Sequence, residues 1–440
     1  MAVFGRAQAV KKAVAQMAND IGRRKAVLAA LLFAWGAMSF ALDRATLTGK
    51  VTDASGKPLE HATVLVYHAG EKRGYSTFCP SCYADCGKRA VTNAGGAFAI
   101  NGLSPDLWFE LLVVRSGYTP AFVKRVDPLQ GPAPTAALKV RKPVDDPSRV
   151  VRGQVVDPYG DPMRDAVVTP FAILVEQGPT TMYGTPPGLD PIAATDDKGE
   201  FEIAYTESVS RMALIVEARG MAPKFIILPT GSERQKVKVS LGSLVRGRVV
   251  ENGKPVAGVE VGLRPKVSWT GKGNLAISGS PYDEIRIGTR ENGSFVIAGV
   301  PVPEEWNIYG KMESIASRGA ADPVALATIR DGQEVNVGDL PIRRGYRLRG
   351  KVSLSDGKTI PDGMRVSISS DRTLDTQSVM LPADGSFEFS GLAAGNYSVW
   401  SSVKGYETPK DRADLKASVS HDVDSFDVVL DPVSAASTRR

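Results

Sequence analysis

All three cysteines of the 440-residue chain fall within eight positions, at Cys79, Cys82 and Cys86. Three kinds of chemistry use cysteines this close together: a disulfide that staples a loop, a metal site, and an exchange-active dithiol. A metal site would take His68 as a further ligand. A disulfide between Cys79 and Cys86 closes a less strained ring than one between Cys79 and Cys82, although spacing alone leaves the pairing open. The odd cysteine could also link two chains into a disulfide-bonded dimer.

Residues for catalysis are scarce. The chain has three histidines, His61, His68 and His421, and no G-x-S-x-G sequence supplies a serine nucleophile for them. His68 and Glu71 have the H-x-x-E spacing of two zinc ligands, but the only later histidine lies 353 residues away. No P-loop is present to bind phosphate. We therefore predict that the protein is not an enzyme and has no cofactor, unless the cysteines bind a metal ion.

Tryptophan side chains are candidates for binding sugars, because an indole offers a large flat apolar face with a polar edge. In the segment 395–403, side chains alternate between the two faces of the predicted strand. Trp400 therefore lies on the face away from the apolar residues, together with small polar residues such as Ser398. We expect Trp400 either to bind a glycan or to fill a junction with a neighbouring module. Trp269, in a predicted loop, is the second candidate. Trp306 is in phase with apolar neighbours and is predicted to lie in a core.

The formal net charge of the chain is +6, but most of it lies in residues 1–41, which contain six basic residues and one acidic residue. The remainder is almost neutral, which excludes a basic nucleic-acid-binding surface. A basic cluster at 23–25 precedes an apolar run at 26–40 that is too short to span a bilayer. We predict a signal peptide that is cleaved after Ala41, with an uncleaved anchor as the alternative. The mature chain would have no membrane span and would be secreted, periplasmic or at the cell surface.

The sequence repeats itself four times. A Gly-x-Val opening recurs at intervals of 94 to 104 residues, and a Gly-x-Phe sequence follows each opening. A third landmark, a glycine followed by a large residue, occurs in units one, two and four, and Ser314 stands in its place in unit three. We predict that the four phenylalanines are equivalent core residues. The opening glycines are Gly49, Gly153, Gly247 and Gly350, the phenylalanines are Phe98, Phe201, Phe295 and Phe387, and the third landmarks are Gly117-Tyr118, Gly220-Met221 and Gly405-Tyr406.

Alternating apolar residues and glycine turns are typical of strands and hairpins, and no run of helical periodicity stands out after Ala41. We predict an all-β protein with four tandem Ig-like or transthyretin-like β-sandwich domains after the signal peptide. Short linkers that contain proline predict an extended rod of independent cores. The predicted boundaries are 1–41 for the signal peptide, 42–143, 144–242, 243–344 and 345–432 for the sandwiches, called modules 1 to 4 below, and 433–440 for a disordered tail.

The landmarks resemble those of the carboxypeptidase regulatory-like domain, a transthyretin-like sandwich related to carbohydrate-binding-like folds. Unit one shows the family's G-x-V opening at 49–51, its G-x-P turn at 56–58 and its later Gly-Tyr at 117–118, and unit two shows D-x-x-G-x-F at 196–201. The resemblance covers nearly everything between residues 45 and 432. It implies non-catalytic accessory modules that aid folding, attach to surfaces, or bind glycans or proteins. The catalytic domain of the zinc carboxypeptidases has no counterpart in the sequence.

Together these patterns predict an exported, non-catalytic scaffold or binding protein that binds an extracellular glycan or protein, with a carbohydrate-binding or cell-surface adhesion role. The alternative is a redox or metal-handling protein that acts through the loop with Cys79, Cys82 and Cys86. We expect the cysteine loop, residues 70–90, to be dispensable for packing, because modules 2 and 3 have loops of similar length without cysteines.

Overall fold

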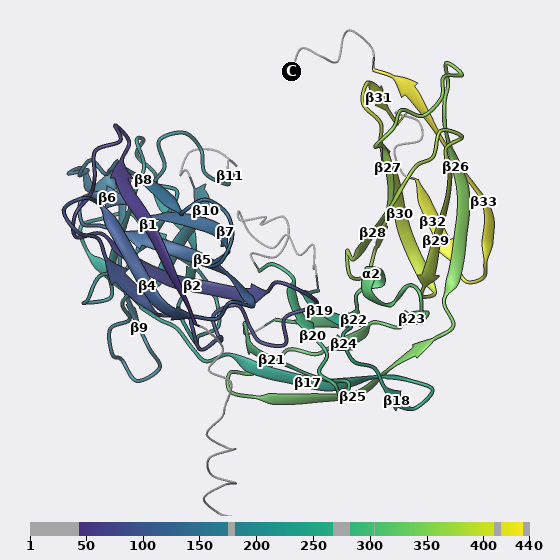
Figure 1. Ribbon diagram of the computed structural model, residues 1–440, viewed down its shortest axis with the longest axis horizontal. Coiled ribbons are helices and arrows are strands. Elements are labelled where there is room, and N and C mark those ends of the chain that lie inside the picture. Colours follow the sequence, from purple (N-terminus) through teal and green to yellow (C-terminus); the bar gives the residue numbers. More distant parts are fainter. Residues whose placement is uncertain (1–43, 175–180, 267–281, 303, 409–414, 434–440) are drawn as a thin grey trace, which may run out of the picture.

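The protein is an all-β chain of four β-sandwiches, which confirms the predicted fold class (Figure 1). The predicted signal peptide lies outside the described residues. Within the described part of the chain, no helix is both long enough and apolar enough to cross a membrane. The computed structural model describes residues 44–174, 181–266, 282–302, 304–408 and 415–433.

Modules 1 and 2 each consist of two facing sheets, and a short 3-10 turn, η1 (Pro147–Arg149), leads into module 2. The sheets of module 1 are β4 (Ala97–Leu103), β1 (Ala45–Asp53), β8 (Thr135–Val140) and β6 (Tyr118–Thr119) against β3 (Arg89–Val91), β2 (Thr63–Glu71), β5 (Leu107–Val114) and β7 (Ala121–Val126). Those of module 2 are β13 (Glu200–Ala204), β9 (Val150–Val156) and β16 (Arg234–Lys238) against β11 (Thr181–Tyr183), β10 (Val167–Leu174), β14 (Arg211–Glu217) and β15 (Lys224–Pro229), with β12 (Ala193–Ala194) beside β10.

Modules 3 and 4 repeat this plan, and module 3 adds a single helical turn, α2 (Met312–Ile315). The sheets of module 3 are β18 (Lys254–Pro255), β17 (Ser243–Glu251), β25 (Glu334–Arg343) and β23 (Ala320–Ala321), with β21 (Ser294–Val300) beside β17, against β20 (Ile285–Gly288), β19 (Glu260–Pro265), β22 (Trp306–Gly310) and β24 (Val324–Leu326). Those of module 4 are β29 (Ser386–Leu392), β26 (Tyr346–Leu354), β33 (Val423–Pro432) and β31 (Tyr406–Glu407) against β28 (Thr376–Met380), β27 (Arg365–Ser370), β30 (Gly395–Ser402) and β32 (Lys416–Val419).

The first and last long strands of every module lie side by side and run parallel. The pairs are β1 with β8, β9 with β16, β17 with β25 and β26 with β33. On its other side, each first strand pairs antiparallel with the strand that carries the landmark phenylalanine. The repeated opening sequence is therefore the central strand of one sheet in each sandwich.

The landmark glycines and phenylalanines of the sequence are partners in the structure. Each opening glycine lies directly opposite its phenylalanine in the antiparallel ladder, and the ring covers the glycine backbone. A Cβ atom at Gly49 would lie 2.4 Å from the ring of Phe98, which explains why the position is glycine. The prediction of equivalent core residues is confirmed, because Phe98, Phe201, Phe295 and Phe387 are all buried.

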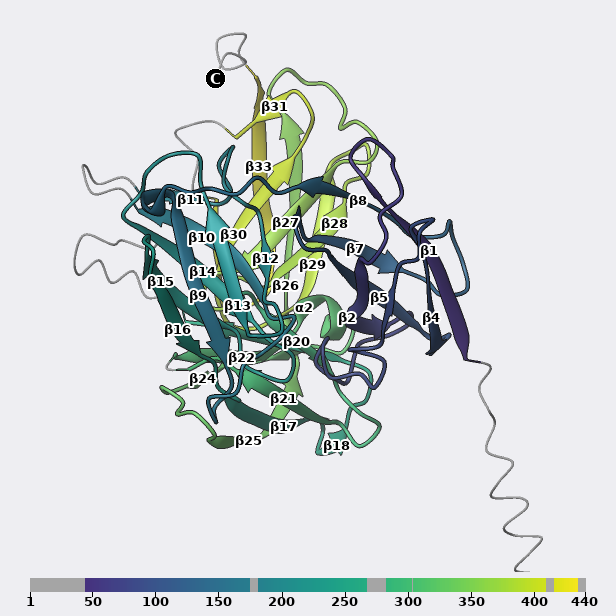
Figure 2. The same cartoon turned by 90° about the vertical axis from the view of Figure 1, so that its left-hand side faces the viewer.

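The modules do not form the extended rod that the linkers predict. Figures 1 and 2 show modules 1 and 2 side by side above one part of module 3, with module 4 above another part. Leu65, Tyr67 and Leu112 of module 1 share a small apolar cluster with Val167 of module 2. The Phe225 amide of module 2 donates a hydrogen bond to the hydroxyl of Tyr282 in module 3. The rod prediction is wrong because it considered linker stiffness and left out the apolar faces that the modules present to each other.

Modules 3 and 4 meet at a buried ion pair. The Lys311 ammonium, just before α2, contacts the carboxylates of Glu284 in module 3 and Asp375 in module 4, and all three side chains are less than 10% exposed. The other carboxylate oxygen of Asp375 accepts the Met312 amide at 2.7 Å. Burial raises the pKa of Glu284, but hydrogen bonds from Tyr309 and Lys311 outweigh it and leave the pKa below its usual value. Arg286 also contacts Glu284, at 2.6 Å, so each buried carboxylate at this junction has a cation beside it.

The helical turn α2 stands where module 3 lacks the third sequence landmark. Ser314, the residue found in place of the glycine, accepts the Glu260 amide and donates to the Lys311 carbonyl. The side chain of Met312, a module 3 residue, packs in the core of module 4. The missing landmark therefore marks a segment that joins two modules.

Candidate functional site

An exposed sheet face of module 4 surrounds Trp400. Strand β30 alternates as its sequence indicates: Tyr397 and Val399 are 3% exposed and face the core, whereas Trp400 is 40% exposed on the outer face. Trp400 lies opposite Ser367 of β27, and Ser367 lies opposite Ser378 of β28. The indole is therefore flanked across two neighbouring strands by small hydroxyl side chains.

Two oppositely charged side chains, those of Asp371 and Lys416, lie next to Trp400 on the same face of the sheet. Ser398, two residues before Trp400, donates to Asp371 at 2.9 Å. The Lys416 ammonium on the adjacent strand β32 lies 3.2 Å from the same carboxylate oxygen and 2.7 Å from the Ser398 hydroxyl. In the next row, the Ser367 and Ser378 hydroxyls are 2.7 Å apart. We call these residues, Trp400, Ser367, Ser378, Ser398, Asp371 and Lys416, the Trp400 face.

The Trp400 face combines the two kinds of contact that a sugar ring needs. An indole face packs against the apolar C–H face of a sugar, while hydroxyls, a carboxylate and an ammonium exchange hydrogen bonds with sugar hydroxyls. The surface is the outer side of a sheet, so it suits one side of a polymer better than a small molecule, which needs a concave site. Figure 1 shows this sheet on the side of module 4 that is turned toward modules 1 and 2.

The other aromatic candidates have different outcomes. Trp269 lies outside the described residues. Trp306 is fully buried and stacks on Tyr282, with ring centroids 6.4 Å apart, so it is a core residue as predicted. Sequence analysis missed Asp371 and Lys416, which reach the Trp400 face from a turn and an edge strand. The alternating serines of 367–370 were a signal that could have indicated the polar face.

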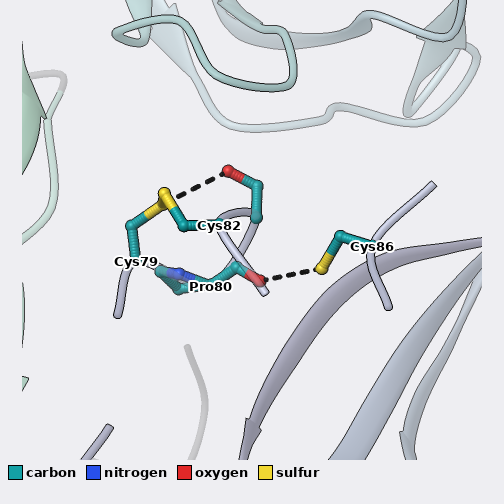
Figure 3. Close-up of a disulfide and its surroundings, with 5 residues drawn as sticks. Cys79, Pro80, Cys82 and Cys86 are labelled. Atoms are coloured by element: carbon teal, nitrogen blue, oxygen red, sulfur yellow. Dashed lines mark hydrogen bonds between the residues drawn. A yellow bond between two sulfur atoms is a disulfide. The ribbon is translucent and has the colours of Figure 1, made fainter. Parts of the chain in front are cut away.

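The cysteine loop contains a disulfide between Cys79 and Cys82, whose Cα atoms are 5.0 Å apart, so the favoured pairing of Cys79 with Cys86 is wrong (Figure 3). Cys86 is 2% exposed, and its thiol donates to the Pro80 carbonyl. Burial raises the pKa of the Cys86 thiol to about 11, so the thiol is protonated and unreactive at neutral pH. A thiol this buried is also not placed for a disulfide between two chains.

His68 does not join the cysteines. It lies on β2 opposite Glu110 of β5, and its Nδ1 is 2.9 Å from a Glu110 carboxylate oxygen. Across the described residues, no three His, Cys, Asp or Glu side chains form a group that could hold a metal ion. His421 lies in module 4, away from the cysteines, and its side chain forms a hydrogen bond with the neighbouring Ser420. The metal hypothesis therefore lacks the ligand set that it needs.

The cysteine loop does contribute to packing, contrary to expectation. Tyr83 and Cys86 belong to the main core of module 1. Asp85, 2% exposed, accepts hydrogen bonds from Arg44 at 3.0 Å and from the Ser104 amide at 2.9 Å, and Lys88 contacts it as well. Burial raises the pKa of Asp85, but these hydrogen bonds outweigh it and leave the pKa below its usual value.

The same loop connects modules. The carbonyl of Ser76 accepts the amide of Gly288 in module 3 at 2.6 Å, and Arg290 of module 3 lies over the Phe78 ring. The cysteine loop therefore contacts module 3 as well as the core of module 1.

We expect Tyr83→Ala to lower the free energy of unfolding by about 3 kcal/mol, because it removes a buried ring from the core of module 1. Changing Cys79 and Cys82 to Ser opens a ring of only a few residues and should cost about 2 kcal/mol or less. Urea unfolding followed by circular dichroism measures both. Equal stability of Tyr83→Ala and the parent would show that the loop is no part of the core.

Two stretches of the chain match known domain families. Residues 46–140 match the carboxypeptidase regulatory-like domain, and residues 343–428 match the second β-sandwich domain of the BOS complex subunit NOMO1-like family. They correspond to modules 1 and 4. No curated protein matches the sequence as a whole.

Solved structures with similar β-sandwiches include the TIE protein of Bacillus anthracis, which is 10% identical with a TM-score of 0.18 and covers 90% of this chain and 75% of its own. Another is BcpA, the major pilin subunit of Bacillus cereus, which is 12% identical with a TM-score of 0.18 and covers 68% of this chain and 100% of its own. Such low values carry no information about ligands. The two domain families and the four sandwiches show that this chain contains tandem β-sandwich domains of the carboxypeptidase regulatory-like kind.

Proposed function

We propose that the chain is an exported, non-catalytic binding protein whose module 4 holds a polysaccharide on the Trp400 face. The observation that carries this proposal is the exposed indole of Trp400, which is set among paired hydroxyls and one carboxylate. Export is supported by the N-terminal sequence pattern at 1–41. A non-catalytic role is supported by the domain families matched by modules 1 and 4.

The ligand in this proposal is a neutral polymer. Asp371 and Lys416 neutralise each other, so this pair gives no preference for an acidic or a basic partner. A flat face with one aromatic platform holds one or two sugar rings, and a polymer offers many equivalent rings to it. The redox or metal alternative has less support, because the Cys86 thiol is buried and, within the described residues, no group of potential metal ligands forms around it.

Trp400→Ala should weaken polysaccharide binding by roughly 30-fold, which is the effect of losing about 2 kcal/mol at a central aromatic contact. The test is co-sedimentation with insoluble cellulose and chitin, followed by affinity electrophoresis in soluble β-glucan and xylan. Tyr159→Ala is the matched control, because Tyr159 is 88% exposed on a turn of module 2. Binding that survives Trp400→Ala unchanged would place the glycan site elsewhere, and no binding to any of the four polymers would contradict the proposal.

A further inference from the structure

Modules 1, 2 and 4 have a groove at the same structural position. Each groove runs beside the strand with the landmark phenylalanine and near an edge strand of the other sheet, and in modules 1 and 4 it also borders the opening glycine. The grooves of modules 1 and 4 are similar in size, about 630 and 590 Å³. Equivalent positions in the three modules line these grooves. The residue directly after the landmark phenylalanine is Ala99 in module 1, Glu202 in module 2 and Glu388 in module 4. The residue seven positions before the phenylalanine is Val91, Ala194 and Met380, respectively.

In module 2, the end of module 1 forms one wall of the groove. Its walls include the Gly117–Tyr118 turn of module 1 and Arg141, which follows the last strand of that module. Arg141 donates to Asp190 at 3.0 Å and lies 3.6 Å from the Glu202 carboxylate. The chain therefore shows what this groove can bind: the third-landmark turn of another module together with the residue that follows its last strand.

In module 1, the same groove is open and apolar. All the residues that line it belong to module 1 itself. Val91 is 58% exposed at its edge, and Ala97 and Ala99 are exposed along its floor. Module 1 has Ala99 at the position of Glu202 in module 2. A segment that binds the module 1 groove therefore needs an apolar residue at the position of Arg141.

The end of module 4 has that residue. Its Gly405–Tyr406 turn is built like the turn of module 1: the Val433 amide donates to the Gly405 carbonyl, as the Arg141 amide donates to that of Gly117. Val433 therefore takes the place of Arg141, and it is 38% exposed. Among the described residues, the hydrogen bonds of this turn all end within module 4.

We propose that module 4 of one copy docks its Gly405–Tyr406 turn and Val433 into the module 1 groove of a second copy, head to tail. Val433 against Ala99 replaces the Arg141–Glu202 contact with an apolar one. Figures 1 and 2 show β31 and β4 well apart on different modules, so the contact joins two chains. The groove of module 4 is a poorer match, because it has the charged Glu388 where module 1 has Ala99 and so offers Val433 no apolar partner. Because the two docking surfaces differ, the interface can add further copies into a ring or a filament.

Sedimentation velocity of the purified chain at rising concentration tests the proposal, and reversible association is the expected result. Val433→Asp and Ala99→Glu each place an unpaired charge in an apolar contact and should each raise the dissociation constant about tenfold or more. Both positions are on the surface, and thermal melts of each variant should match the parent. Mixing Val433→Arg copies with Ala99→Glu copies allows both a new arginine–glutamate contact and the parental Val433–Ala99 contact, so it should restore the association that each variant lacks alone.

Tyr159→Asp is the matched control, because it adds a charge at an exposed aromatic outside both docking surfaces and should leave association unchanged. Trp400→Ala should also leave it unchanged, which separates this interface from the proposed glycan site. A chain that stays monomeric up to its solubility limit would overturn the proposal. So would association that Val433→Asp and Ala99→Glu leave intact, or a charge-swapped mixture that fails to associate.

Discussion

Lys311→Met will lower the free energy of unfolding at the junction of modules 3 and 4 by about 3–5 kcal/mol, because it leaves the buried carboxylate of Asp375 without its cation. Asp375 is 1% exposed, so water cannot take over the role of the ammonium, whereas Glu284 keeps its ion pair with Arg286. Hydrogen exchange should rise in β22, α2 and β28, the elements that meet at this junction. Urea unfolding gives the magnitude, and exchange measured by mass spectrometry gives the location.

The matched control is Lys358→Met. Lys358 pairs with Asp356 at 2.9 Å on the surface of module 4, and its side chain is 72% exposed. A surface ion pair contributes roughly 0–1 kcal/mol, so this variant should unfold close to the parent. If both lysine variants have the same small effect, the buried ion pair does not hold the two modules together.

Phe98→Ala and Phe387→Ala should each cost about 3–5 kcal/mol, since each removes a buried ring that packs over a glycine backbone. The two substitutions should destabilise different sets of modules. Module 1 shares apolar contacts with module 2 and its cysteine loop hydrogen-bonds to module 3, so Phe98→Ala should raise hydrogen exchange in all three. Phe387→Ala should raise it in module 4 and, through Met312, in the adjoining part of module 3. One cooperative transition that both substitutions shift equally would count against this division.

The repeat was enough to predict the sandwich fold and its four core phenylalanines, because both depend on local alternation and on turns that glycine requires. The outward direction of Trp400 follows from the same period of two. Contacts between modules have no such local signal. Lys311 and Asp375 are separated by more than sixty residues, and nothing near either residue indicates its partner.

The cysteine loop shows a second limit of sequence analysis. Ring strain favoured Cys79 with Cys86, but the fold places Cys86 in the core beside Tyr83 and leaves Cys82 free to pair with Cys79. Burial decided the pairing, and the burial of a loop residue depends on the whole sandwich. Asp371 and Lys416 were missed for a related reason, because their place beside Trp400 depends on the order of strands in the sheet.

The parallel pairing of first and last strands gives the modules a mechanical property. In each module the chain enters along one strand and leaves along its neighbour in the same direction, so a pull on the two ends slides these strands past each other. The ladder hydrogen bonds lie across the strands and are loaded together in shear, whereas an antiparallel hairpin pulled at its open end would unzip one bond at a time. Tension along the chain therefore meets its greatest resistance at the strands with the repeated opening glycines.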